Sequence, residues 1–313
     1  MSLHILPVQS IVSAPIASNE LRTRFQRTLI AHAAPPASRH LRLIVPQSSR
    51  HGGVSAGMEY KFKPEVHLQL AGASEFQFPD LSVQAPAGSA IIVPAGLPCR
   101  HRACREPHTF GTLSVSFHST AVAICFTKAD SQQAVVAEEM GLYPTANLGK
   151  LVDLATMAID LGRNGHTHGM DGAKAVAVAL FWALINLLET PPPETGADSD
   201  KLFQVKWLVH NHLANPELSV AFLAKLMHCS PGYLSHVFSE EAGESLIQYI
   251  HQQRIARASE ALAVKALSIS EVAWACGFSD AGYFSRLFRK TTGLTPQAYR
   301  QKLAGDERVD FEA

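Results

Sequence analysis

The spacing of apolar residues changes twice along the chain. Between about residue 40 and residue 126 they form short runs, such as LRLIV, VHLQL and TLSVSF, separated by turns rich in Gly and Pro. Short strands in this arrangement are typical of an all-β barrel or sandwich. From 133 to 189 the apolar residues recur at helical spacing instead, and 173–189 is apolar nearly all round, which predicts a buried helix.

A break in this pattern marks a domain boundary. Residues 190–200 read TPPPETGADSD, and three consecutive prolines cannot continue a helix. We therefore predict an effector-binding and dimerisation domain over 1–189, a linker over 190–200, a helical domain over 201–303 and a tail over 304–313. The expected fold class is α+β, with a β-barrel over about 40–126 and helices over about 133–189 in the first domain.

The helical domain contains an internal repeat, in which 218–250 resembles 267–300. The segment SPGYLSHVF, which begins at Ser230, matches SDAGYFSRLF, which begins at Ser279. Each copy has the signals of a helix-turn-helix unit, with capping serines at Ser219, Ser230 and Ser268. We expect five aromatic side chains of the second helices to face the core: Tyr233, Phe238, Tyr283, Phe284 and Phe288.

The second copy carries a longer motif, in which GFSDAGYFSRLFRK is followed by G-x-T-P-x2-Y-R and ends at Arg300. With it, 202–303 resembles the DNA-binding domain of the AraC/XylS transcription regulators. The resemblance implies base contacts in the major groove from Gly232, Ser235, His236, Gly282, Ser285 and Arg286. It also implies phosphate contacts from Lys225, Arg254, Arg289 and Lys290.

Charge and composition agree with a DNA-binding part inside a globular protein. The chain has no net charge, but 201–303 holds 11 Lys and Arg against 7 Asp and Glu, a net charge of +4. The longest apolar run, 175–188, is shorter than the roughly 20 residues of a membrane span. An odd number of cysteines, five, does not suggest a disulfide framework. We expect a cytoplasmic protein without a membrane partner.

The β-rich part carries a weaker resemblance to the cupin-like effector domain of the same family. Gly88-x5-Pro94-x-Gly96 resembles the second cupin motif, but Cys99 stands where a metal-binding cupin has histidine. Glu65, His67 and Gln69 alternate on one strand face without matching the first motif. With His101, these three form the expected effector site.

The segment from Cys99 to His108 offers one further hypothesis. Cys99, His101, Cys104 and His108 are a ligand set suited to zinc, and the neighbouring arginines can lower a thiol pKa. The alternative is a basic loop with half-buried cysteines, and we favour it. We expect no cofactor.

The most consistent function is an effector-responsive transcription regulator, an activator, with double-stranded DNA and RNA polymerase as partners. A homodimer is expected through Leu180, Leu184 and Leu187. The alternatives are a cupin-type metalloenzyme with an accessory helical domain and a structural adaptor. The enzyme requires a His/His/Glu set that the sequence does not assemble.

Overall fold

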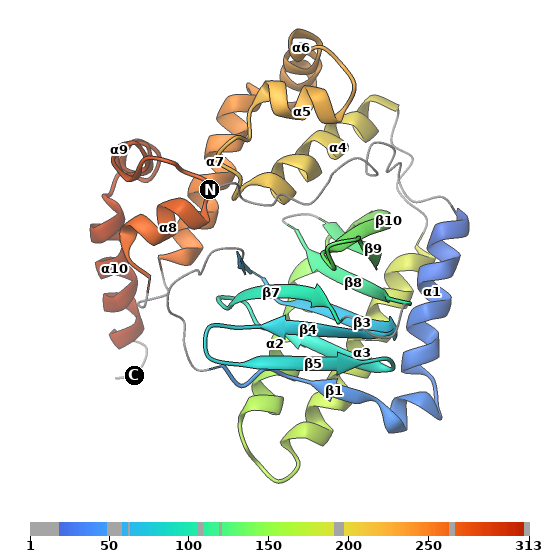
Figure 1. The fold of residues 1–313 in the computed structure, drawn as a ribbon. Coiled ribbons are helices and arrows are strands. Elements are labelled where there is room, and N and C mark those ends of the chain that lie inside the picture. Colours follow the sequence, from blue (N-terminus) through green and yellow to red (C-terminus); the bar gives the residue numbers. More distant parts are fainter. Residues whose placement is uncertain are drawn as a thin grey trace. The chain divides into compact units, whose positions relative to one another are not determined.

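The computed structural model describes residues 19–48, 58–61, 63–104, 109–118, 121–190, 197–262 and 267–309. These residues form two compact units, 19–190 and 197–309. The first unit combines strands with helices and the second is helical, so the α+β prediction is confirmed (Figure 1).

Strands of the first unit form two sheets. One has six strands in the order β1-β6-β3-β8-β9-β10, and the other has four in the order β2-β7-β4-β5. The strands are β1 Arg42–Ile44, β2 Glu59–Tyr60, β3 Glu65–Ala71, β4 Ala73–Gln77, β5 Ser82–Pro86, β6 Ser89–Val93, β7 Pro98–Ala103, β8 Gly111–Phe117, β9 Ala121–Ala129 and β10 Val135–Pro144. Strand β1 pairs in parallel with β6, and the other pairs are antiparallel.

The six-stranded sheet is buried on both faces. Val66 and Leu68 of β3 belong to the large apolar core that also contains residues of the helices. Their neighbours His67 and Gln69 are 7% and 2% exposed and contact residues of the four-stranded sheet. Because side chains alternate across a strand, one face of the sheet carries the apolar core and the other carries polar groups.

Three α-helices and a short 3₁₀ helix accompany these sheets: α1 Asn19–Ala33, η2 Ala37–His40, α2 Leu148–Arg163 and α3 Gly169–Glu189. Phe25 and Leu29 of α1 are fully buried, as are Leu180 and Phe181 of α3. Figure 1 shows α2 and α3 behind the strands and α1 at one side of them. Burial of this apolar face is the main stabilising contribution to the first unit.

One boundary predicted from the sequence is wrong in this unit, and one helix was not predicted. Residues 135–144 form β10, although they lie within the segment 133–189 that was expected to be helical. The strand pairs with β9 from Val135 to Pro144, so tertiary pairing overrides the local pattern. The sequence pattern also did not identify α1. An isolated bridge joins Arg102 of β7 to Ala134, the residue before β10.

The predicted dimer residues Leu180 and Leu184 are wrong as interface residues. Both are 0% exposed and lie in the core of their own unit, and Leu187 is partly buried against the same core. Helix α3 is long and apolar enough to cross a membrane by length and composition alone. Its buried residues pack within the unit, which is the behaviour of a central core helix.

Seven helices form the second unit: α4 Ala197–His212, α5 Val220–Leu226, α6 Pro231–Ala242, α7 Leu246–Ala261, α8 Ile269–Ala275, α9 Ala281–Thr292 and α10 Pro296–Val309. Helix α4 begins inside the linker predicted over 190–200, whose residues 191–196 lie outside the described residues. Helix α10 extends into the predicted tail, 304–313, as far as Val309.

Replacing a core leucine of α3 tests its assignment to the core. We expect Leu184→Ala to lower the free energy of unfolding of the first unit by about 2–5 kcal/mol, because it leaves a cavity among fully buried neighbours. Trp182→Ala is the control on the exposed face of the same helix, where Trp182 is 41% exposed, and we expect a smaller loss. Urea unfolding measures both. A Leu184→Ala protein with unchanged stability and a lower oligomeric state would restore the dimer-interface assignment.

Candidate nucleic-acid interface and effector site

Local signals in the sequence determine the first helix-turn-helix unit, α5 and α6. The Ser219 hydroxyl accepts a hydrogen bond from the backbone N–H of Phe222 at 3.2 Å, and Ser230 caps α6 in the same way. Pro231 occupies the first turn of α6, where a missing N–H costs little. His228 adopts the left-handed region, with φ of 49°, in the turn between the helices.

The second helix-turn-helix unit, α8 and α9, repeats this construction. Ser268 and Glu271 form the predicted capping box, with hydrogen bonds of 2.7 and 3.1 Å. The bonds from Ser268 lower the pKa of the Glu271 carboxyl. Gly277, with φ of 83°, takes the place of His228. Asp280, rather than Ser279, caps α9, which accounts for the extra residue in the second copy.

The structural repeat is larger than the sequence repeat, because α4 and α7 also correspond. Lys201 of α4 donates to the hydroxyl of Tyr233 at 3.3 Å, and His251 of α7 lies 3.5 Å from the hydroxyl of Tyr283. Both pairs are 32 residues apart. Each copy is therefore a three-helix unit, α4-α5-α6 and α7-α8-α9, with α10 added at the end.

The second helix of each helix-turn-helix unit, α6 and α9, buries one stripe and exposes another. We call these two the reading helices, because the predicted base contacts lie on them. Leu234 and Phe238 of α6 are buried, and Phe284 and Phe288 are buried at the equivalent positions of α9. The opposite stripes carry residues of the predicted base-reading set. Gly232, His236, Gly282 and Arg286 are exposed, and Ser235 and Ser285 are half-buried. The Ser285 hydroxyl donates to the carbonyl of Ala281 at 2.8 Å.

Tyr233 and Tyr283 are exceptions to the predicted core, since they are 47% and 42% exposed. Leu234 and Phe284 take the buried positions one residue further along. The tyrosines border the outer stripes, and their hydroxyls contact Lys201 and His251. The predicted burial of Phe238, Phe284 and Phe288 is confirmed.

Three of the four predicted phosphate contacts are exposed: Lys225, Arg289 and Lys290. The fourth, Arg254, is wrong. It is 7% exposed, and its guanidinium donates to the backbone carbonyls of Leu213 and Asn215 at 3.2 and 2.7 Å. A side chain held in this way is not available to DNA.

The two reading helices differ in charge. Helix α9 carries Arg286, Arg289 and Lys290 and no acidic residue. Helix α6 carries His236, whose ring lies 3.5 Å from the carboxylate of Glu240, and Glu241 follows. Because phosphate attraction depends on cations, α9 is suited to supply most of the electrostatic affinity of the pair.

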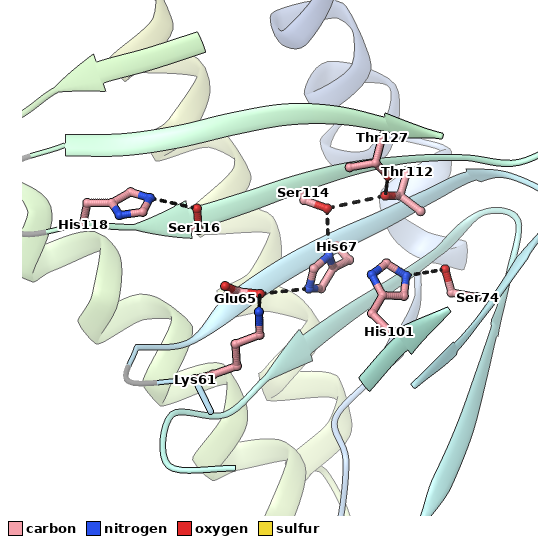
Figure 2. A network of polar contacts seen from close by, with 10 residues as sticks. All are labelled: Lys61, Glu65, His67, Ser74, His101, Thr112, Ser114, Ser116, His118 and Thr127. Carbon is pink, nitrogen blue, oxygen red and sulfur yellow. Dashed lines mark hydrogen bonds and ion pairs between the residues drawn. The ribbon is translucent and has the colours of Figure 1, made fainter. Parts of the chain in front are cut away.

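In the unit of residues 19–190, three of the four predicted effector residues, Glu65, His67 and His101, lie in a buried polar network between the two sheets (Figure 2). The His67 ring lies 2.8 Å from the hydroxyl of Ser114 and 3.5 Å from the carboxylate of Glu65. His101, on β7, lies 2.8 Å from the hydroxyl of Ser74, which also donates to Gln69 at 2.5 Å. The four predicted residues thus form two hydrogen-bonded groups, which meet where the rings of His67 and His101 lie 5.0 Å apart.

A lysine that the sequence analysis did not single out completes this network. The Lys61 ammonium lies 3.0 Å from the carboxylate of Glu65. Burial by itself raises the pKa of Glu65, but the charge of Lys61 and the hydrogen bond with His67 hold that pKa well below its usual value. Burial, with the nearby His67 and Lys61, lowers the pKa of His101, so its imidazole is neutral near pH 7.

The arrangement does not fit a cupin metal centre. Both ring nitrogens of His67 already contact neighbours, and Lys61 provides the positive charge beside Glu65. Among the described residues there is no group of three or more His, Cys, Asp or Glu side chains placed to hold a metal ion. The donor set expected for the alternative function, a metalloenzyme, is therefore not assembled in this part of the chain.

The cysteine hypothesis receives no support either. Cys99 is 3% exposed and lies in an apolar cluster with Phe76 and Ile91. Cys104 follows the far end of the same strand, about 15 Å away by the rise of a strand. Burial and the charge of Glu75 raise the pKa of Cys104, opposite to the expected effect of the arginines. His108 lies outside the described residues.

An open cleft adjoins the network at one end. Its wall on α1 includes Arg24, Arg27 and Thr28, and its floor includes Thr112 and Thr127. The hydroxyls of Thr112 and Thr127 lie 2.5 Å apart, and Thr112 is 3.4 Å from Ser114, the partner of His67. A continuous line of polar groups therefore connects the cleft to the buried histidine.

The signal for the missing members of the network was present in the sequence. Thr112, Ser114 and Ser116 alternate along β8 in the same way as Glu65, His67 and Gln69 along β3, and the two sets face each other in register. Lys61 and Ser74 carry no such pattern, because only the pairing of the sheets brings them to the network.

Comparison with known proteins agrees with the geometry of the second unit. A family model described as a helix-turn-helix domain matches residues 223–302. Over 101 residues the chain is 39% identical to the transcriptional regulatory protein YesN of Bacillus subtilis, covering 31% of this chain and 27% of that protein. Over 92 residues it is 36% identical to the arabinose operon regulatory protein of Escherichia coli, covering 29% and 32%.

A longer match, of 195 residues at 27% identity, is to the transcriptional regulator YpdC of Escherichia coli and covers 62% of this chain and 67% of that protein. Among solved structures, the DNA-binding domain of AdpA in complex with a target DNA is 27% identical, with a TM-score of 0.32, over 34% of this chain and 95% of that one. The C-terminal domain of the response regulator YesN from Fusobacterium nucleatum is 28% identical, with a TM-score of 0.31, over 31% and 95%.

The class of protein follows from the paired helix-turn-helix units and the sequence matches: residues 197–309 form a helix-turn-helix domain of the kind found in transcription regulators. This helix-turn-helix domain is similar to those of the AraC family. The chain spans about a quarter to a third of the length of YesN and of the arabinose operon regulator.

Removing Lys61 tests the buried network. Glu65 has a lowered pKa in the folded state, so its ionised form stabilises the first unit above the unfolded pKa near 4.5, and this contribution is lost as pH falls below that value. We expect Lys61→Met to cost about 1–3 kcal/mol at pH 7, because a buried carboxylate loses its charged partner. The loss should shrink as the pH is lowered and Glu65 is protonated.

The matched control is Lys128→Met, since Lys128 lies 3.5 Å from Glu138 with both side chains about half exposed. We expect that variant to cost less than about 1 kcal/mol at any pH. Urea unfolding between pH 4 and pH 8 measures both variants. Equal, pH-independent losses would contradict the role of the Lys61–Glu65 pair.

Proposed function

We propose that the protein is a cytoplasmic, sequence-specific transcription activator that binds adjacent major grooves through α6 and α9 in response to a small molecule. The observation that carries the proposal is the matched pair of outer stripes on these helices. Each stripe is forced outward by the burial of its opposite side.

In this proposal the second reading helix supplies the strongest base contact. The Arg286 guanidinium is exposed and makes no ion pair or hydrogen bond with the described residues. Arginine binds the O6 and N7 atoms of guanine through two parallel hydrogen bonds, which is the most common specific contact in the major groove. His236 and Ser235 of α6 and Ser285 of α9 supply weaker polar contacts, and Gly232 and Gly282 allow close approach.

Phosphate contacts from Lys225, Arg289 and Lys290 would fix the position of the two helices on the duplex. Such contacts add affinity without sequence preference and depend on salt concentration. Since two of the three lie on α9, the second helix-turn-helix unit would anchor the protein while the first adjusts the sequence preference.

The first unit is proposed to bind the effector in its cupin-like double sheet, at the network of Glu65, His67, Gln69 and His101. Buried polar groups are costly, and a cluster of them between two sheets is more than folding requires. The cleft beside Thr112 and Thr127 offers an approach to the network. Polar hydrogen-bonding groups that line an otherwise apolar interior favour a small polar ligand.

The proposal of activation is supported by a relative, and the proposal of a homodimer by the exposed residues of α3. The transcriptional activator RhaR of Cronobacter sakazakii is 42% identical over 69 residues, which favours an activator that contacts RNA polymerase. A homodimer stays a proposal, and with Leu180 and Leu184 buried, the exposed residues of α3 that could contact a partner include Ala175, Ala179 and Trp182.

Genome-wide occupancy combined with transcript levels tests the proposed function. The tagged protein should occupy promoter regions, and transcripts next to the occupied sites should fall when the gene is deleted. Rising transcripts would show a repressor. Uniform occupancy without preferred sites would contradict sequence-specific binding.

Replacing Arg286 tests the base-reading assignment. With a duplex selected by the wild type from random DNA, we expect Arg286→Ala to weaken binding by about 1–3 kcal/mol and to remove the preference for one base pair. Fluorescence anisotropy with single-base variants of the duplex measures both effects.

Arg289→Ala is the control, because a phosphate contact should weaken all duplexes equally and reduce the slope of log affinity against log salt by about 1. An Arg286→Ala protein that keeps the wild-type preference at every base pair would refute the assignment.

A further inference from the structure

A buried arginine lies where the two three-helix units of the DNA-binding domain meet. Arg254 is on α7, the first helix of the second unit. Its Nε and Nη2 donate to the carbonyls of Leu213 and Asn215, in the loop that follows α4 of the first unit. Its guanidinium carbon lies 5.5 Å from the ring centre of Phe278, in the turn between α8 and α9. One side chain thus contacts both three-helix units.

Gly277 brings the same two segments into direct contact. A Cβ atom at this position would lie 2.0 Å from the carbonyl oxygen of Leu213 and 3.0 Å from two nitrogens of Arg254. Its φ of 83° is also strained for any other residue. The turn of the second helix-turn-helix unit is therefore packed against the backbone of the first, and only glycine fits between them.

The chemistry of Arg254 is unusual for a side chain that serves stability alone. It forms no ion pair with a described carboxylate, and its charge is balanced only by carbonyl dipoles and an aromatic ring. An apolar residue would fill the same space without the cost of burying a charge. What the planar guanidinium adds is direction, because its fixed donors set the angle between the groups that they join.

A second arginine in the same domain provides a contrast. Arg300 on α10 donates its Nε to the carbonyl of Leu262, at the end of α7, at 3.3 Å. This bond also joins an arginine to a carbonyl at a helix end. It connects α7 to α10, however, and this hydrogen bond does not reach the first three-helix unit. Arg300 is therefore a matched control for the loss of such a bond.

We propose that Arg254 is a positioning residue for DNA binding, which holds α6 and α9 at one fixed angle so that both helices bind a duplex as a single body. The inference rests on the proposed function, since it requires that both helices read DNA. When two binding modules are fixed in the correct geometry, the second contact forms with little further loss of entropy. Without the clamp, each unit would bind its half-site nearly independently.

The experiment compares a full site with a half-site. The probes are a duplex selected by the wild-type full chain from random DNA and the same duplex with the half-site of α6 scrambled. For the wild type, we expect the full site to bind at least about tenfold more tightly than the half-site. For Arg254→Met, affinity for the full site should fall to within about threefold of the half-site value, while affinity for the half-site stays within about threefold of wild type.

Two further variants separate positioning from stability. Arg300→Met should keep the wild-type ratio between the two probes even if its melting temperature falls. Arg254→Lys keeps the charge but loses the fork of donors, so its ratio should lie between those of Arg254→Met and the wild type. It also serves as the test if Arg254→Met does not fold, as judged by circular dichroism.

Three results would overturn the inference. Arg254 variants that keep the wild-type ratio between the two probes, even if both affinities fall in equal proportion, would leave Arg254 at most a structural role. The same loss of ratio in Arg300→Met would show a general effect of stability. A wild-type protein that selects no preferred duplex, or only a single half-site, would contradict the proposed function itself, and with it this inference.

Discussion

The DNA-binding domain depends on the burial of one side of each reading helix. Leu234 and Phe238 fix α6, and Phe284 and Phe288 fix α9, so residues on the opposite sides must face outward. Removing a large apolar side chain from such a core costs about 3–5 kcal/mol, which exceeds any preference of the outer residues for another orientation. The identity of the outer residues can therefore vary for recognition while the fold stays the same. Four buried side chains thus account for the exposure of His236 and Arg286.

The unit of residues 19–190 also has elements with two unlike faces. In the six-stranded sheet, residues that point towards the helices are apolar, and several that point towards the other sheet are polar and bonded to one another (Figure 2). The charge of Lys61 stabilises the ionised carboxylate of Glu65 in this interior, and the lowered pKa of His101 keeps its imidazole neutral. The result is a network of directional groups inside a sheet layer, which can respond to a change in any one partner. It is a different design from the metal centre that two histidines and a glutamate suggest.

Features encoded by neighbouring residues could be predicted from the sequence. The caps at Ser219, Ser230 and Ser268 and the alternation of His67 and Gln69 follow from local hydrogen bonding and strand period. What covers a given face could not be predicted. An apolar stripe on α3 looks the same whether it packs on its own sheet or on another chain, and a basic residue such as Arg254 looks the same whether it faces phosphate or two carbonyls. Residues 135–144 form a strand because β9 pairs with them, which is information held outside the segment.

Both reading helices are proposed to contact one face of a duplex as a fixed pair. This arrangement is tested most directly by changing the spacing in a selected site. Adjacent major-groove contacts lie about 10–10.5 base pairs apart, so inserting 5 base pairs between the half-sites turns one of them to the opposite side of the duplex. If the pair is fixed, this insertion reduces affinity to the level of a single half-site, and inserting a full turn does not restore it, because the two helices cannot separate. Affinity that is unchanged by the 5-base-pair insertion would contradict the claim.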